Sequence, residues 1–253
     1  MSSPAGTGSG SVPGLAIEVQ GLAYDGIPLF TDLTLELRAG QWTGLLGPSG
    51  TGKSALIRIA AGLDVGKGAY RARPTDGAPL QASVALMAQR DALLPWLTVL
   101  DNACLDDRTG DEPVAARKER AAALLTEAGL AEYLDAAPVT LSGGMRQRVV
   151  LVRALLDNRP IVLLDEPFAA MDAASRRQMQ DLAFRELAGR TILSVTHDPM
   201  EALRLCQRIV LAEGRPTRLR DVPVPDTPSP RPPDNPAVLA SYQALLSFLL
   251  QAG

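Results

Sequence analysis

The sequence predicts an α/β protein built around a largely parallel central sheet. Short apolar runs of strand length alternate along the chain with longer segments of helical periodicity, which is typical of strand–helix–strand units. The 253 residues also have an ordinary globular composition, with 46% hydrophobic and 21% charged side chains. A chain of this length and composition can bury a sizeable core.

The predicted strands are of two kinds. Residues 15–20 and 33–37 alternate apolar and polar side chains, as half-buried strands do. Residues 41–47 become apolar without alternation, which is typical of a strand buried on both faces. Further strands are expected at 83–88, 161–165, 191–196 and 208–212.

The predicted helices lie between these strands and have recognisable ends. A helix from Ser54 to about residue 61 ends at Gly62, and one over 114–129 is closed by Gly129. Ser142 is a suitable N-cap for a long helix over 143–156. Two more helices are expected over about 173–188 and 199–206.

The two ends of the chain differ from its middle. Residues 1–14 are rich in Gly, Ser and Pro and are expected to form a flexible tail. Seven of the 20 prolines fall within 221–236, which predicts a stiff, extended linker with little packing. Residues 237–253 are expected to form a helical tail, amphipathic over 237–251.

Composition excludes several classes of protein. The net charge of −3 and the pI of about 5.3 argue against a general nucleic-acid binder. No apolar run approaches the ~18–20 residues that span a bilayer, and the N-terminus has no secretory signal pattern. A single histidine excludes a multi-histidine metal site, and two distant cysteines suggest a reduced, cytosolic chain.

A phosphate-binding motif stands between a predicted buried strand and a predicted helix. Its glycines let the backbone curl so that successive N–H groups point at phosphate oxygens. Its lysine supplies a positive charge for the β- and γ-phosphates, and its last serine supplies a hydroxyl for Mg²⁺. The alternative is a glycine-rich turn, which the strand-before, helix-after context disfavours. The motif consists of Gly47, Pro48, Ser49, Gly50, Thr51, Gly52, Lys53 and Ser54.

A second apolar strand, 161–165, ends in two acids. Asp165 at the strand end is expected to face the phosphate loop and hold Mg²⁺ through water. Glu166 is expected to act as the general base for the water that attacks the γ-phosphate. The alternative, a strand that ends in solvated acids, is common by itself but less so beside a phosphate loop.

Residues 141–148, LSGGMRQR, resemble the signature of the ATP-binding subunits of ABC transporters. Ser142, Gly143 and Gly144 open a helix and so form a second anion site. The resemblance implies that this site grips the γ-phosphate of ATP bound to a second copy, so that a homodimer encloses two ATP molecules. The alternative is a capped helix without a ligand.

The resemblance covers about residues 15–220, the expected ATP-binding domain. It implies a P-loop NTPase (RecA-like) core with an antiparallel β-subdomain. It also implies an inserted α-helical subdomain, over about 90–157, that carries the signature.

Two further nucleotide contacts follow from the resemblance. Tyr24 occupies the place of an aromatic that stacks on adenine, with a core tyrosine as the alternative. Asp172 matches a loop along the dimer seam, and a helix N-cap role is compatible with that. Ala55 departs from the family pattern because a threonine is usual there, so weaker nucleotide affinity is expected.

The resemblance implies two more catalytic residues. Gln89, after the strand 83–88, matches a glutamine that approaches Mg²⁺ and the attacking water. His197, after the strand 191–196, matches a histidine that bonds the γ-phosphate and helps to position Glu166. Solvated side chains are the alternatives at both positions.

Three functional classes compete: a membrane importer subunit, a soluble ABC ATPase for DNA repair or translation, and a module without catalysis. The 52-residue interval from Gln89 to Leu141 (141 − 89) is too short for a coiled-coil arm. One P-loop and an acidic pI also disfavour the soluble class. The presence of Glu166 and His197 disfavours a module without catalysis.

An apolar cluster after Gln89 favours the importer. Its residues could form a groove for a helix of an integral membrane permease, although part of the cluster must belong to the subdomain core. Its sequence, LLPWLTVLDN, resembles the nitrate/sulfonate/taurine-type importers, and residues 40–54 resemble the pyrimidine thiamine-precursor branch. The expected place is then peripheral, on the cytoplasmic face of the membrane, with a solute-binding protein as an indirect partner and no nucleic acid. The cluster consists of Leu93, Leu94, Trp96 and Leu97.

Overall fold

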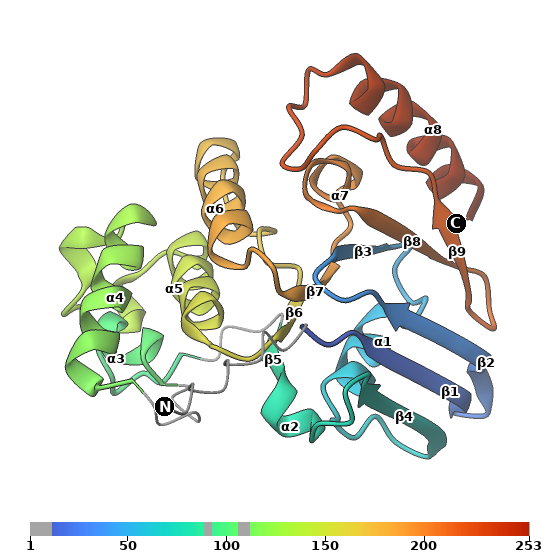
Figure 1. Ribbon diagram of the computed structural model, residues 1–253, viewed down its shortest axis with the longest axis horizontal. Helices are drawn as coiled ribbons and strands as arrows, with labels where there is room; N and C mark the ends of the chain where they lie inside the picture. Colours follow the sequence, from blue (N-terminus) through green and yellow to red (C-terminus); the bar gives the residue numbers. More distant parts are fainter. Residues whose placement is uncertain (1–11, 89–92, 106–111, 253) are drawn as a thin grey trace, which may run out of the picture.

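The computed structural model describes residues 12–88, 93–105 and 112–252, and it has two sheets and a set of helices (Figure 1). The described strands of the central sheet are β3 (Trp42–Leu46), β5 (Val84–Met87), β6 (Ile161–Asp165), β7 (Thr191–Val195), β8 (Arg208–Glu213) and β9 (Arg218–Val222). A smaller sheet contains β1 (Leu15–Tyr24), β2 (Ile27–Leu37) and β4 (Gly68–Pro74).

The helices lie between and around the sheets. The described α-helices are α1 (Lys53–Ala60), α2 (Leu80–Ser83), α3 (Val99–Ala103), α4 (Val114–Glu127), α5 (Gly143–Leu156), α6 (Ala173–Glu186), α7 (Pro199–Leu205) and α8 (Pro236–Ala252). Two short 3₁₀ helices, η1 (Ala131–Tyr133) and η2 (Pro138–Thr140), precede α5. Figure 1 shows α3, α4 and α5 gathered on one side, away from the smaller sheet.

The central sheet runs in the order β5-β6-β7-β3-β8-β9. All its neighbouring strands pair in parallel except β8 and β9, which are antiparallel. The smaller sheet, β2-β1-β4, is antiparallel throughout. The predicted fold class is therefore confirmed, including the antiparallel β-subdomain and the helical insertion.

Both faces of the inner strands β3, β6 and β7 are buried, which explains why these strands lack apolar–polar alternation. Successive residues enter two different cores: Leu45 packs with the smaller sheet and α1, whereas Leu46 packs with the helices on the other face. Leu163 and Leu164 divide in the same way. Because side chains alternate along a strand, apolar residues are favoured at successive positions.

The strands of the smaller sheet are longer than the sequence pattern indicates. The predicted strand 33–37 is only the second half of β2, which joins β1 through a tight turn with Asp25 and Gly26 at positive φ (50° and 77°). Such a turn suits the twist of a hairpin. Pro28 and Asp32 interrupt the apolar pattern of β2, and β4 is mostly exposed, so neither gives a clear alternation.

The proline-rich segment corrects one expectation. It was expected to have little packing, but Val222 ends β9 in a buried position and Arg231 is only 3% exposed. Arg231 donates from Nη1 to the carbonyls of Leu203 and Cys206, both at 2.7 Å. These two carbonyls lie at the end of α7 and have no intrahelical partner there, so a buried guanidinium fastens the segment to that helix.

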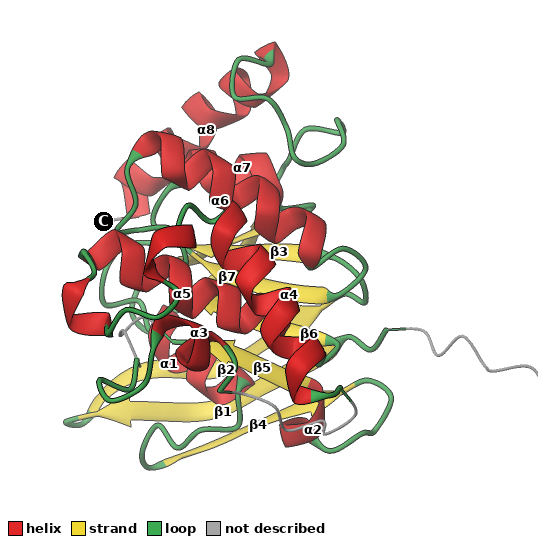
Figure 2. Cartoon of the chain, turned by 90° about the vertical axis from the view of Figure 1, so that its left-hand side faces the viewer, coloured by secondary structure: helices red, strands yellow, loops and turns green. Residues whose placement is uncertain are grey.

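The helix that follows is also packed. Val238 and Leu245 of α8 are fully buried in the same core as α7. Figure 2 shows α8 and the smaller sheet at opposite ends of the molecule. The C-terminal helix therefore lies far from the antiparallel sheet.

Replacing Arg231 with methionine should destabilise the protein by ~1–3 kcal/mol, because buried carbonyls lose their donors while the apolar stem is kept. Urea unfolding of the full chain measures this free energy. The exposed Arg218 of β9 provides the control, and Arg218→Met should change the value by no more than ~0.5 kcal/mol. Equal effects of the two substitutions would show that Arg231 does not fasten the segment.

Candidate nucleotide-binding and hydrolysis site

Three neighbouring strands bring the predicted site residues to one edge of the central sheet. Val195 of β7 lies in register with Leu45 of β3 on one side and with Asp165 of β6 on the other. The phosphate loop, Glu166 and His197 follow these strands directly. Because the carboxyl ends of parallel strands meet at one edge, ligands of such sheets usually bind there.

A cavity of about 580 Å³ opens at this edge. That volume lies within the usual range of sites for small molecules. Its lining combines an apolar end from the β1–β2 hairpin with a polar end from the phosphate loop. The lining residues are Tyr24, Asp25, Ile27, Pro28, Leu29, Ser49, Gly50, Gly52, Lys53, Ser54, Ala55, Asp165, Glu166, Val195 and Arg215.

The phosphate loop needs glycine at two of its positions. Gly47 has φ 149°, and a Cβ there would lie 2.2 Å from the carbonyl oxygen of Ala212. Gly52 has φ 82°, and a Cβ there would lie 2.6 Å from the ring of Phe30. Backbone and core atoms therefore enclose the loop, which holds its curled shape against the start of α1.

Lys53 folds back over the loop. Its Nζ donates to the carbonyl oxygens of Gly47 at 2.7 Å and Pro48 at 2.8 Å. Burial lowers the pKa of the Lys53 ammonium, and the carboxylates of Glu166 and Asp165 oppose that shift. A cation is thus placed on the inner side of the loop, where it could attract phosphate oxygens.

Asp165 is a buried carboxyl group with an unused oxygen. It is 7% exposed, and its Oδ1 has no hydrogen-bond partner in the described part of the chain. Desolvation, and secondarily the charge of Glu166, raise the pKa of Asp165 to about 6, although Lys53 opposes this. An orphaned oxygen beside the exposed Ser54 in one cavity is a donor pair that suits a hard cation such as Mg²⁺.

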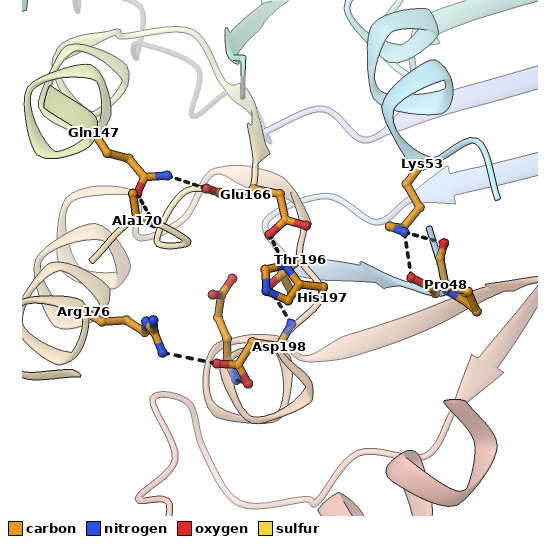
Figure 3. A network of polar contacts seen from close by, with 11 residues as sticks. Pro48, Lys53, Gln147, Glu166, Ala170, Arg176, Thr196, His197 and Asp198 are labelled. Carbon is orange, nitrogen blue, oxygen red and sulfur yellow. Dashed lines mark hydrogen bonds and ion pairs between the residues drawn. The ribbon is translucent and has the colours of Figure 1, made fainter. Parts of the chain in front are cut away.

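Glu166 points toward His197 (Figure 3). Its Oε2 lies 2.7 Å from Nδ1 of the histidine. The Glu166 side chain is 12% exposed and that of His197 is 70% exposed. The carboxylate is thus shielded at the cavity wall, while the imidazole lies between it and solvent.

Two residues that contact this site are not among the predicted site residues. Gln147 of α5 donates from Nε2 to the carbonyl of Glu166 and accepts from the amide of Ala170 (Figure 3). Arg215, in the β8–β9 turn, lines the cavity and donates from Nη2 to the carbonyl of Gly50 at 3.1 Å. Gln147 lies within the signature-like run 141–148, which could have drawn attention to it, whereas no motif contains Arg215.

Tyr24 lies at the apolar end of the cavity. Tyr24 is 47% exposed, so it is not a core tyrosine, and its hydroxyl donates to the carbonyl of Val65 at 2.7 Å. An exposed aromatic residue in the cavity lining is compatible with stacking on a base.

The signature residues lie elsewhere. Ser142 caps α5 by accepting from the amide of Met145, and it is exposed together with Gly143. Ser142, Gly143 and Gly144 are not among the described residues that line the cavity. Asp172 caps α6, and its bonds with Ser175 lower the pKa of its carboxyl group.

The apolar cluster contains one very exposed side chain. Trp96 is 75% exposed, whereas Leu93, Leu94 and Leu97 are partly buried. The buried Asn102 shapes this loop, because its Nδ2 donates to the carbonyl oxygens of residues 94, 97 and 98. Gln89, the remaining predicted site residue, lies outside the described residues.

The fold and the site together define a P-loop ATPase. The sequence pattern of the ABC transporter family matches residues 30–169. The aliphatic sulfonates import ATP-binding protein SsuB of Delftia acidovorans is 40% identical over 240 residues, covering 92% of this chain and 94% of that protein. An ABC transporter ATP-binding protein of Haemophilus influenzae is 40% identical over 216 residues, covering 83% of this chain and 88% of that protein.

Comparison with solved structures also indicates an ABC ATP-binding subunit. A dimeric ATP-binding cassette in a post-hydrolysis state, bound to ADP and phosphate, is 27% identical with a TM-score of 0.68. The match covers 82% of this chain and 98% of that chain. The chain therefore belongs to the ABC transporter family, as an ATP-binding and ATP-hydrolysing subunit.

Asp165 should make stability depend on pH. A carboxyl group whose pKa rises on folding stabilises the fold below about pH 4, and this contribution is lost as the pH rises through about 6. Without nucleotide, Asp165→Asn should therefore raise the unfolding free energy at pH 7.5 by ~1–3 kcal/mol, and much less at pH 4.5.

Urea unfolding at the two pH values checks this prediction. The exposed Asp234 provides the control, and Asp234→Asn should change the unfolding free energy by at most ~0.5 kcal/mol at either pH. A gain at pH 7.5 no larger than at pH 4.5 would contradict the prediction.

Proposed function

We propose that this chain is the ATPase that energises a membrane importer for a small solute, and that two copies close head to tail around two ATP molecules. One observation carries the catalytic part of the proposal. The phosphate loop, the orphaned oxygen of Asp165 and the Glu166–His197 pair meet at one edge of the sheet.

Different residues of the chain would bind different parts of the nucleotide. Tyr24 offers a ring to the adenine, and the loop amides with Lys53 hold the phosphates. Ser54 and Asp165 would hold Mg²⁺, and Gln89 would join them by family resemblance. When bound, the ion supplies charge neutralisation for the phosphate oxygens.

Glu166 is proposed to act as the general base. Its carboxylate can accept a proton from a water at the cavity wall, and a protonated Nδ1 of His197 would hold it by donating to Oε2. The exposed edge of His197 remains available for the γ-phosphate. The pair thus orients the base and offers a donor to the developing charge.

A second copy is proposed to complete the site. Ser142, Gly143 and Gly144 present the N-terminus of α5 at the surface and outside their own cavity. A helix N-terminus attracts anions, so this surface suits the γ-phosphate of ATP held by another copy. The dimeric solved relative supports such an arrangement.

The importer part of the proposal rests on the relatives and on an exposed loop. Several relatives are named as import subunits for aliphatic sulfonates, which favours an importer over a soluble ATPase for DNA repair or translation. No helix in the described residues is long and apolar enough to cross a membrane. Trp96 and its neighbours would then dock on a separate permease, at the cytoplasmic face of the membrane.

The solute would be selected by that permease and its binding protein. The named relatives favour a small organic anion such as a sulfonate. The pyrimidine thiamine-precursor branch, expected from residues 40–54, stays a prediction. Transport assays with both kinds of solute in a reconstituted importer would decide between them.

Glu166→Gln should slow hydrolysis by ~10²–10⁴-fold, because an amide cannot accept the proton. ATP binding should persist, and ATP should now hold a stable dimer that light scattering after gel filtration can detect. Turnover at the wild-type rate would remove Glu166 from its proposed role.

Trp96→Glu should release the chain from its permease, because a charge replaces the exposed apolar side chain at the proposed contact. The fraction of the chain that purifies with a multi-span permease from native membranes should fall at least ~10-fold, which corresponds to ~1.4 kcal/mol. ATP hydrolysis by the isolated chain should not change.

Val114, 68% exposed at the start of α4, provides a matched control. Val114→Glu adds the same charge at another exposed apolar position and should leave the association intact. Equal loss with both variants would count against a specific dock at Trp96.

A further inference from the structure

The side chain of Gln147 is buried and hydrogen-bonded through both its nitrogen and its oxygen. It is 8% exposed, its Nε2 donates to the carbonyl of Glu166 at 2.6 Å, and its Oε1 accepts from the amide of Ala170 at 2.7 Å. Only an amide of this length offers a donor and an acceptor to the same loop, because glutamate has no donor and asparagine is one carbon shorter. These bonds join α5 to the segment between β6 and α6.

That segment holds Glu166 in an unusual backbone conformation. Glu166 has φ 52°, a region that costs a residue with a Cβ ~1–3 kcal/mol and persists only where the surroundings enforce it. Its N–H donates to the carbonyl of Val195 at 2.9 Å, and its own carbonyl accepts from Gln147. The two bonds hold both sides of the residue, and the carboxylate then projects to His197 (Figure 3).

The same loop is packed against the beginning of α5. A Cβ on Gly144 would lie 2.7 Å from the carbonyl oxygen of Ala170, so the two backbones are in close contact. Gly144 belongs to the surface proposed to bind the ATP of a second copy. The backbone contact and the Gln147 bonds therefore connect that surface to the loop that carries the chain's own Glu166.

We propose that Gln147 is a positioning residue for hydrolysis: it holds the backbone of Glu166 so that the carboxylate faces His197. The inference rests on the proposed role of Glu166 as the base. Gln147 is not among the described residues that line the cavity, and its two hydrogen bonds go to main-chain atoms of Glu166 and Ala170, not to the imidazole.

Two substitutions of Gln147 separate the effect of its hydrogen bonds from the effect of its size. Gln147→Met keeps the length and removes both hydrogen bonds, whereas Gln147→Glu keeps an acceptor for Ala170 and removes the donor to Glu166. Gln178→Met is the matched control, because Gln178 also donates to a main-chain carbonyl, that of Glu127, away from the site.

Kinetics give the first measurement. A displaced base should lower kcat by ~10–100-fold in both Gln147 variants, while the Kd for ATP stays within about twofold because the phosphate loop is untouched. Gln178→Met should leave both constants unchanged. Unchanged kcat, or a parallel loss of ATP affinity and folded protein in both variants, would overturn the proposal.

The single histidine of the chain gives a second measurement that does not depend on catalysis. In nucleotide-free protein, one set of imidazole NMR resonances reports on His197. Gln147→Met should move these resonances in the direction seen in Glu166→Ala, and Gln178→Met should not. Resonances that stay in place would overturn the positioning role.

The two readouts also separate this inference from the proposed function. If Glu166→Gln hydrolyses ATP normally, the role of Glu166 as base fails, whatever the His197 resonances show. If Glu166→Gln is slow but the Gln147 variants match the wild type in kcat and resonance, only the role of Gln147 fails.

Discussion

The parallel pairing of β6, β7 and β3 is the constraint on which the rest of the structure depends. It sets Asp165, Val195 and Leu45 side by side, so the three loops that follow must share one edge. Both faces of these strands are buried, and a shift by one residue would send each side chain into the wrong core. The hydrophobic cores thereby fix the position of groups that are themselves polar.

That position is electrostatically unfavourable without a ligand. Asp165 is buried beside Glu166, while Lys53, a cation in the lining of the same cavity, donates to carbonyls of its own loop. Burying one carboxyl group beside another, with one oxygen unpaired, lowers the stability of the folded chain. The surrounding hydrophobic cores must offset that cost. A ligand that brings positive charge to Asp165 and negative charge to Lys53 would relieve both, so its binding energy would be concentrated at the proposed site of hydrolysis.

Local patterns predicted five strands of the central sheet, all except β9, because their sequences are mostly apolar, and three of the helices have recognisable ends at Gly62, Gly129 or Ser142. They predicted the phosphate loop, Asp165 and Glu166 because these follow such runs directly. The same patterns failed for β4 and for the first half of β2, where exposed positions and Pro28 remove the alternation. They also failed for Arg231, because a proline-rich composition does not show that one charged residue within it is buried.

The order of the motifs could be read from residues that are close in the chain. That order indicates the family and the chemical groups that are available. Only the folded chain decided how those groups meet. Gln147 and Glu166 are 19 residues apart, His197 and Glu166 are 31 apart, and Arg215 and Gly50 are 165 apart. Such contacts depend on packing between distant segments, which leaves no periodicity or spacing in the sequence. The positive φ of Glu166 has the same origin, since its neighbours in space, not its own preference, hold it there.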